Sequence, residues 1–75
     1  MATYRFDEKH DATIRPVEKL AKGRYRCLVH VGLTDGSPTD SSFEAEGKTA
    51  KQAEKAALQL ASDAISAGKI KYLEK

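Results

Sequence analysis

Three lysines at helical spacing are the residues of this sequence best placed to bind an anion. Lys48, Lys51 and Lys55 fall within about 60° of one another on a helix that turns 100° per residue. The free N–H groups and the dipole of a helix N-terminus add to their positive charge, so this corner favours a phosphate group. The alternative interpretation is that these lysines only keep an alanine-rich helix soluble.

Other reactive side chains do not form a catalytic set. Cys27 and His30 have opposite parity in one predicted strand, so they point to opposite faces and cannot act as nucleophile and base. Four side chains of kinds that bind metal ions lie in the polar N-terminal segment, namely Asp7, Glu8, His10 and Asp11. This segment has no rigid frame to hold them in the geometry of a metal site. No phosphate-binding glycine loop is present. We therefore expect a non-enzymatic protein without a metal ion or cofactor.

The lysines belong to an amphipathic helix predicted over residues 48–67. Thr49 is the expected N-cap, Gln52 completes a capping-box pattern, and Gly68 is a typical helix-ending residue. One side of the helix gathers its small and apolar residues, which are Ala50, Ala53, Ala57, Leu58, Leu60, Ala61, Ala64 and Ile65. Because most of them are alanines, the helix needs a sheet that supplies bulkier side chains.

The sheet is predicted from three stretches before the helix. Residues 24–33 alternate most clearly, with Tyr25, Cys27, Val29, Val31 and Leu33 on the side expected to face the helix. Residues 41–46 alternate again after a polar turn at 34–40. Residues 12–20 are rich in β-branched side chains, and Pro16 limits that strand to a sheet edge or a bulge.

We therefore predict an α+β fold, in which a three-stranded antiparallel sheet carries one C-terminal helix packed on one face (β-β-β-α). Residues 1–75 form a single domain. Tyr4 and Phe6 share strand parity, so the N-terminal residues 1–11 either add an edge strand or form a loosely held terminus. For residues 69–75 the pattern fits three alternatives: a short strand, a docking segment or a frayed end.

One helix leaves the second face of the sheet uncovered. That face is expected to show Leu28 and His30 together with charged residues of both signs, which are Arg24, Arg26, Glu44 and Glu46. The arginines and glutamates are expected to form cross-strand ion pairs. A mixed surface with an apolar centre and a charged rim is also the composition of a protein interface.

Composition narrows the setting of the protein. No apolar run approaches the ~20 residues of a membrane span, and the single cysteine predicts a reducing, cytoplasmic environment. Residues 1–47 hold seven basic against eight acidic residues, whereas residues 48–75 hold six against three. The positive charge therefore belongs to the helix and the tail.

Residues 47–61 resemble the last helix of a double-stranded-RNA-binding domain, with matches at Thr49, Lys51, Ala53, Ala56 and Ala57. That resemblance implies phosphate contact by Lys51. Ala50 and Glu54 stand where the family carries lysines, and the family's first helix has no counterpart here.

The order of three strands and a helix is similar to the sheet-reading DNA-binding domains of some phage integrases and plant transcription factors. That resemblance implies base contacts from Arg24, Arg26 and His30. The carboxylates of Glu44 and Glu46 on the same face oppose this arrangement, since they would meet phosphates.

The sequence thus favours a small binding module for nucleic acid, DNA or RNA, through Lys48, Lys51 and Lys55 with help from Arg24 and Arg26. The alternative is a protein-protein interaction module, an adaptor or inhibitor, that uses the open face at Leu28 and His30 or the edge strand around Pro16. Both a monomer and a homodimer fit this prediction.

Overall fold

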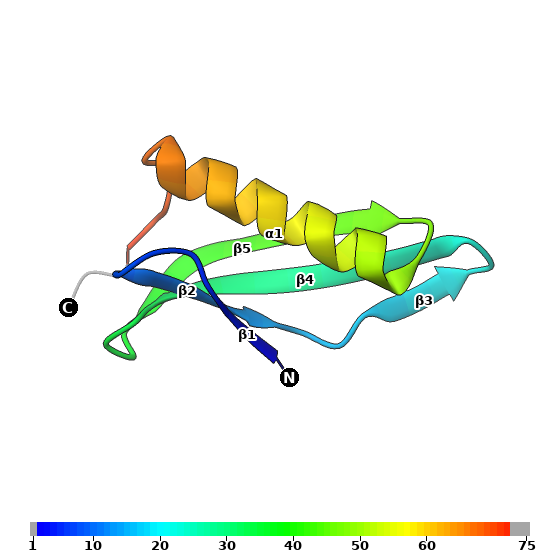
Figure 1. Ribbon diagram of the computed structural model, residues 1–75, viewed down its shortest axis with the longest axis horizontal. Coiled ribbons are helices and arrows are strands. Elements are labelled where there is room, and N and C mark those ends of the chain that lie inside the picture. Colours follow the sequence, from blue (N-terminus) through cyan, green and yellow to red (C-terminus); the bar gives the residue numbers. More distant parts are fainter. Residues whose placement is uncertain (1, 73–75) are drawn as a thin grey trace.

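The protein is an antiparallel sheet with one long helix lying across one of its faces (Figure 1). The computed structural model describes residues 2–72. Its elements are β1 (Ala2–Arg5), β2 (His10–Ile14), β3 (Glu18–Ala21), β4 (Arg24–Leu33), β5 (Pro38–Gly47) and α1 (Ala50–Ser66). The predicted α+β class with a single C-terminal helix is confirmed, but the prediction of three strands is wrong, because the sheet formed by the described residues has five.

Pro16 divides one predicted strand into two. The stretch predicted over residues 12–20 forms β2 and β3, and both pair with β4 along the edge that β5 does not use. Pro16 has no N–H to donate to the ladder. The Arg15 amide still donates to the Leu28 carbonyl at 2.9 Å, and pairing resumes where Glu18 lies opposite Arg26. The proline thus interrupts the pairing along this edge of β4 but does not end it.

The N-terminal residues supply the other additional strand. β1 pairs antiparallel with the outer edge of β2, with Tyr4 opposite Ala12. Of the two alternatives for this segment, an edge strand is therefore the observed one.

The core lies between β4 and α1. Cys27, Val29 and Val31 of β4 are fully buried, as the alternation of this strand predicted. α1 opposes them with a row of buried alanines, namely Ala53, Ala57, Ala61 and Ala64. Small side chains bring the helix close to the sheet. Where β5 ends, Gly47 is required, because a Cβ at this position would lie 2.5 Å from the backbone nitrogen of Ala53.

Both ends of α1 are fixed as the sequence indicated. The Thr49 hydroxyl accepts a hydrogen bond from the Gln52 amide at 3.1 Å, and the Gln52 side-chain oxygen accepts one from the Lys48 amide at 3.2 Å. Gly68 follows the helix with a φ of 69°, the left-handed conformation that glycine adopts without strain. These contacts place the start of the lysine-bearing turn.

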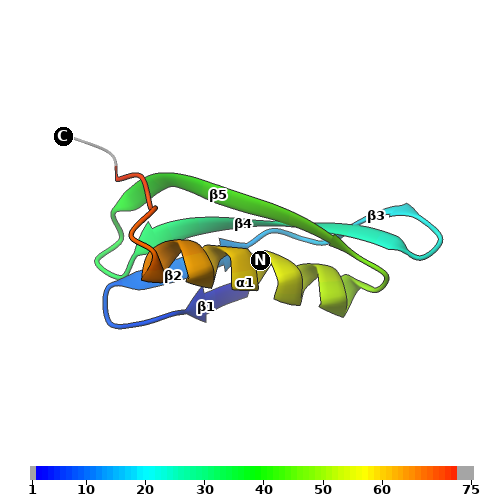
Figure 2. The same cartoon turned by 90° about the horizontal axis from the view of Figure 1, so that it is seen from above.

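The segment after α1 docks on the sheet, as Figure 2 shows from above. Ile70 is buried, and Lys71 exchanges two hydrogen bonds with β5: its carbonyl accepts from the Asp40 amide at 2.7 Å, and its amide donates to the Ser41 hydroxyl at 2.8 Å. Of the alternatives for this tail, residues 69–72 are therefore a docking segment. Residues 73–75 lie outside the described residues.

Candidate functional site

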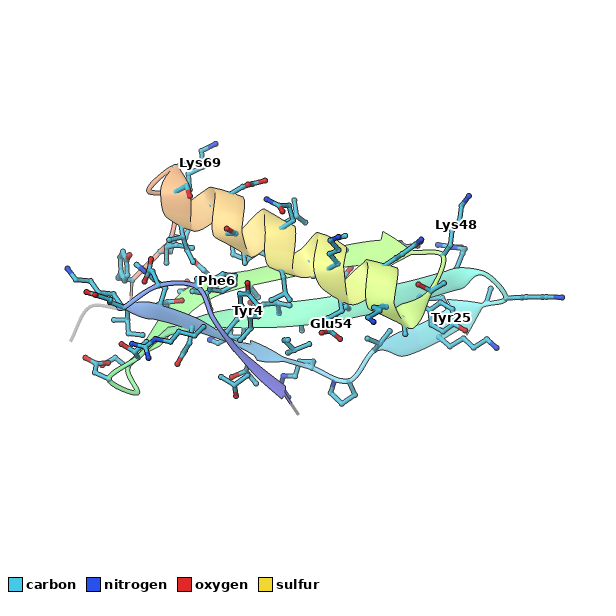
Figure 3. The ribbon with its side chains drawn as sticks, in the orientation of Figure 1. Tyr4, Phe6, Tyr25, Lys48, Glu54 and Lys69 are labelled. Carbon is cyan, nitrogen blue, oxygen red and sulfur yellow. The ribbon has the colours of Figure 1, made fainter. Side chains whose placement is uncertain are left out.

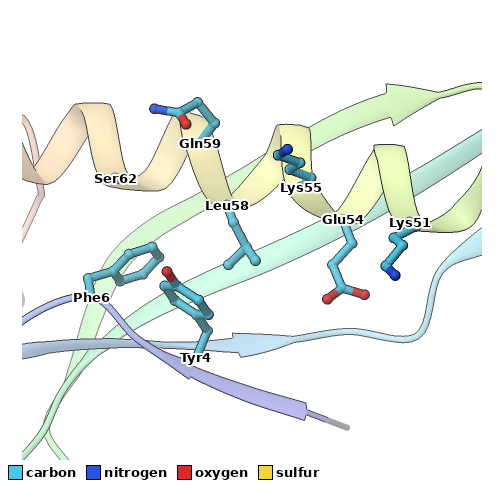
Figure 4. A pocket seen from close by; sticks show the side chains of 8 residues that line it. All are labelled: Tyr4, Phe6, Lys51, Glu54, Lys55, Leu58, Gln59 and Ser62. Carbon is cyan, nitrogen blue, oxygen red and sulfur yellow. The ribbon is translucent and has the colours of Figure 1, made fainter.

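A groove runs between α1 and the edge strand β1 (Figure 4). Its volume is about 380 Å³. Side chains of both elements line it, namely Tyr4, Phe6, Lys51, Glu54, Lys55, Leu58, Gln59 and Ser62. In the close view, Lys51, Glu54 and Leu58 point from α1 toward β1, and the two aromatic rings rise from the β1 side.

The aromatic wall of the groove comes from the first six residues. Tyr4 lies opposite Ala12 in the β1–β2 ladder, and this register turns its ring toward the side of the sheet that carries α1. The rings of Tyr4 and Phe6 meet edge to face, with centroids 5.0 Å apart and an interplanar angle of 62°. Phe6 packs against the core, whereas Tyr4 remains 47% exposed. An accessible aromatic surface therefore faces the groove.

The opposite wall carries unpaired positive charge. Lys51 and Lys55 are one helical turn apart and exposed. Lys48 lies just before the helix, outside the groove lining, and projects from the turn between β5 and α1 (Figure 3). Within the described part of the chain, none of these three lysines forms a salt bridge. The first turn of α1 also contains no acidic residue, so its positive dipole end is not offset there.

Glu54 is the acidic residue among the side chains that line the groove. It is half-buried and points under α1 toward the sheet (Figure 3). Burial raises the pKa of the Cys27 thiol, and the negative charge of Glu54 raises it further. The Glu54 carboxylate thus lies on the sheet side of the groove, toward which Lys51 also points (Figure 4).

The arginines named by the sequence lie on the other face of the sheet and are paired with carboxylates. Arg24 binds Glu46 at 2.9 Å, and Arg26 binds Glu18 at 3.1 Å and approaches Glu44 at 3.8 Å. The hydrogen bond with Glu18 and then the charge of Glu44 raise the pKa of Arg26. The expected ion pairs are present. The structure does not bring Arg24 and Arg26 together with the lysines.

Leu28 and His30 occupy the uncovered face, as their parity predicted. Leu28 is 39% exposed and lies in a shallow hollow beside Arg15, Pro16, Glu18, Arg26 and Glu44. His30 is half-buried and lines a separate hollow with Thr13 and Gly32. The two residues therefore share a face but not a single depression.

The N-terminal acidic residues have a structural role. The Asp7 carboxylate accepts hydrogen bonds from the backbone amides of Lys9 and His10 at 2.8 and 2.7 Å, and these bonds, that of Lys9 first, lower the pKa of Asp7. The His10 ring contacts Asp7 through Nδ1 at 3.1 Å and the Tyr72 hydroxyl through Nε2 at 2.7 Å. This cluster links the β1–β2 turn to the tail.

Over residues 2–72, no three side chains of His, Cys, Asp or Glu converge so as to hold a metal ion. α1, the helix of this region, is too short and too polar to cross a membrane.

The sequence pointed to Lys51 and Lys55 but not to Tyr4 and Phe6 as residues of one groove. The shared parity of Tyr4 and Phe6 was a visible signal, but only the pairing of β1 with β2 places both rings beside α1. Comparison of the chain with protein-family models, curated proteins and solved structures found no match.

Proposed function

We propose that this protein is a small, non-enzymatic nucleic-acid-binding module that contacts phosphates through Lys48, Lys51 and Lys55. The observation that supports the proposal is the distribution of unpaired charge. These lysines have no carboxylate partner among the described residues, whereas Arg24 and Arg26 are engaged by glutamates. The proposal therefore assigns phosphate binding to the start of α1 and not to the open face.

The physical basis is electrostatic. A lysine that neutralises a phosphate releases condensed counterions, and this release contributes most to affinity at low salt. The N-terminus of α1 adds the positive end of a helix dipole, and the Thr49 cap holds that turn in place. The buried, unpaired thiol of Cys27 is consistent with the reducing, cytoplasmic setting that the proposal includes.

The test is a salt titration of binding by fluorescence anisotropy, with labelled single-stranded and duplex DNA and RNA. We expect affinity to fall linearly with salt on a logarithmic scale. Each lost phosphate contact lowers the slope by about 0.7 to 0.9, so changing Lys48, Lys51 and Lys55 together to Gln should lower it by about 2 to 3.

The matched control changes Lys9, Lys19 and Lys22 to Gln. These lysines are also exposed and lie away from the groove, and the net charge changes by the same amount. An equal loss of slope in both triple variants would show that binding depends only on net charge. Absence of binding to every nucleic acid at low salt would refute the proposal.

A second candidate function is protein binding through the uncovered sheet face. It rests on Leu28, which is 39% exposed at the centre of a rim of ion pairs formed by Arg26 with Glu18 and Glu44. An apolar centre with a polar rim is the usual plan of an interface. The partner would be a second copy or another protein.

Leu28→Arg should weaken such an association without unfolding the protein, because the side chain points away from the core. Sizing with light scattering at high protein concentration measures self-association, and thermal melting checks the fold. A monomer at all concentrations, with partner binding unaltered by Leu28→Arg, would reject this candidate.

A further inference from the structure

We infer that the groove between β1 and α1 binds single-stranded nucleic acid, with a base stacked on Tyr4 and the neighbouring phosphates held by Lys51 and Lys55. This inference rests on the proposed function and makes it more specific. It adds the aromatic wall of the groove to the lysine wall and selects unpaired bases as the ligand.

The first step is the position of Tyr4. Its ring is held from one side by the edge-to-face contact with Phe6, at 5.0 Å between centroids, yet 47% of the residue remains exposed. Leu58 of α1 lines the same groove and gives the floor an apolar side chain (Figure 4). A positioned, accessible aromatic ring beside lysines is the combination found in surfaces that bind single strands.

The second step excludes a duplex from this groove. Bases in a double helix are stacked on one another, so their faces are not available to a side chain. The groove volume of about 380 Å³ is near the lower end of small-ligand clefts, which hold about 300 to 1,000 Å³. The groove therefore matches the scale of individual bases, not of a paired helix.

The third step concerns the orientation of the strand. Glu54 and Gln59 also line the groove, and carboxylate and amide oxygens accept hydrogen bonds from the amino groups of cytosine and adenine. A phosphate placed beside Glu54 would be repelled. Base edges are therefore expected next to the Glu54 carboxylate, and the phosphates next to the ammonium groups of Lys51 and Lys55.

The experiment compares single-stranded DNA and RNA of about twelve nucleotides with duplexes of the same sequence. Tyr4→Leu keeps an apolar side chain but removes the aromatic face. We expect it to weaken single-strand binding roughly 5- to 150-fold and to leave the salt slope unchanged, since no phosphate contact is lost. Tyr4→Phe should bind nearly as well as the natural protein. Tyr72→Leu, at a tyrosine that is 54% exposed outside the groove, should have no such effect.

Intrinsic fluorescence provides a second readout. The chain has three tyrosines and no tryptophan, so tyrosine emission is directly visible. A base stacked on Tyr4 should quench part of this emission, and Tyr4→Phe should remove the quenched part while binding persists. If Tyr4→Leu lowers thermal stability, the difference in quenching between the natural protein and Tyr4→Phe still shows whether a base stacks on Tyr4.

The outcomes separate the inference from the proposed function. Salt-dependent binding that is equal for single strands and duplexes and unaffected at Tyr4 would overturn the groove assignment and leave the lysine proposal standing. Binding of no nucleic acid at low salt would overturn both. Preferential single-strand binding that is lost in Tyr4→Leu and kept in Tyr4→Phe supports both.

Discussion

The basic residues of this protein differ in what lies next to them. Arg24, Arg26 and Leu28 share one face of β4. Arg24 pairs with Glu46 of β5, and Arg26 pairs with Glu18 of β3 and lies near Glu44 of β5, so the charge of both arginines is largely compensated. Lys51 and Lys55 share a helix face, and among the described residues neither forms a salt bridge, although Glu54 stands three residues after Lys51. The positive charge of the lysines on α1 is therefore free to bind an anion, whereas that of the arginines on the open sheet face is not. The net charge of the chain does not reveal this difference.

Cys27 provides a residue-scale prediction. Its side chain is fully buried, and burial followed by the charge of Glu54 raises its pKa. We expect negligible labelling by a thiol reagent in the native protein and complete labelling in denaturant, because the thiolate is the reactive form. Rapid native labelling would show that β4 is not packed as described.

The same pKa shift has a consequence for stability. The folded state keeps the Cys27 proton at a pH where the unfolded chain releases it, so stability should decline as pH rises above about 8.5, the ordinary pKa of a thiol. Cys27→Ala, which cannot titrate, should lose this part of the decline in urea titrations across the alkaline range.

At the scale of elements, the sequence predicted best the helix and strand that are defined by residues close to one another in the chain. The ends of α1 follow from Thr49, Gln52 and Gly68, each of which acts on neighbouring backbone groups. β4 was predicted from its alternation because one of its faces is buried. Such elements are readable because the residues that define them are close in sequence.

The break between β2 and β3 and the position of β1 could not be predicted from neighbouring residues, because both depend on pairing with strands that are distant in sequence. Pro16 allowed both a bulge and an edge strand, and the observed break depends on β4, whose Leu28 carbonyl still pairs with Arg15. Likewise, one wall of the groove lies on a predicted helix, but the other depends on a register between Tyr4 and Ala12. Half of the candidate site was therefore predictable from the sequence.

At the scale of the whole molecule, the protein is elongated and has a thin core. Its principal extents are 42 × 23 × 19 Å, and one helix covers one face of the sheet. Among the residues that the structure describes, five of the ten buried hydrophobic ones are alanines, and the larger ones include Ile14, Val29, Val31 and Ile70. In such a core, each large apolar side chain contributes a considerable part of the stability.

Ile70, in the described part of the tail, is a large buried side chain. The tail around it is joined to β5 through Lys71 and to the first residue of β2 through the hydrogen bond between Tyr72 and His10 at 2.7 Å. The tail therefore covers one end of the core between helix and sheet, and it connects strands from both halves of the sequence.

Ile70→Ala should consequently act on the entire fold and not only on the tail. Truncating a buried isoleucine costs about 2 to 5 kcal/mol, and we expect a loss near 2 kcal/mol because a terminal segment can partly relax. A loss of this size lowers the melting temperature by about 10 °C in a domain this small. Hydrogen exchange at the Asp40 and Lys71 amides should also accelerate. Lys69→Ala, an exposed neighbour, is the control; equal melting temperatures for the two variants would show that Ile70 does not contribute to the core.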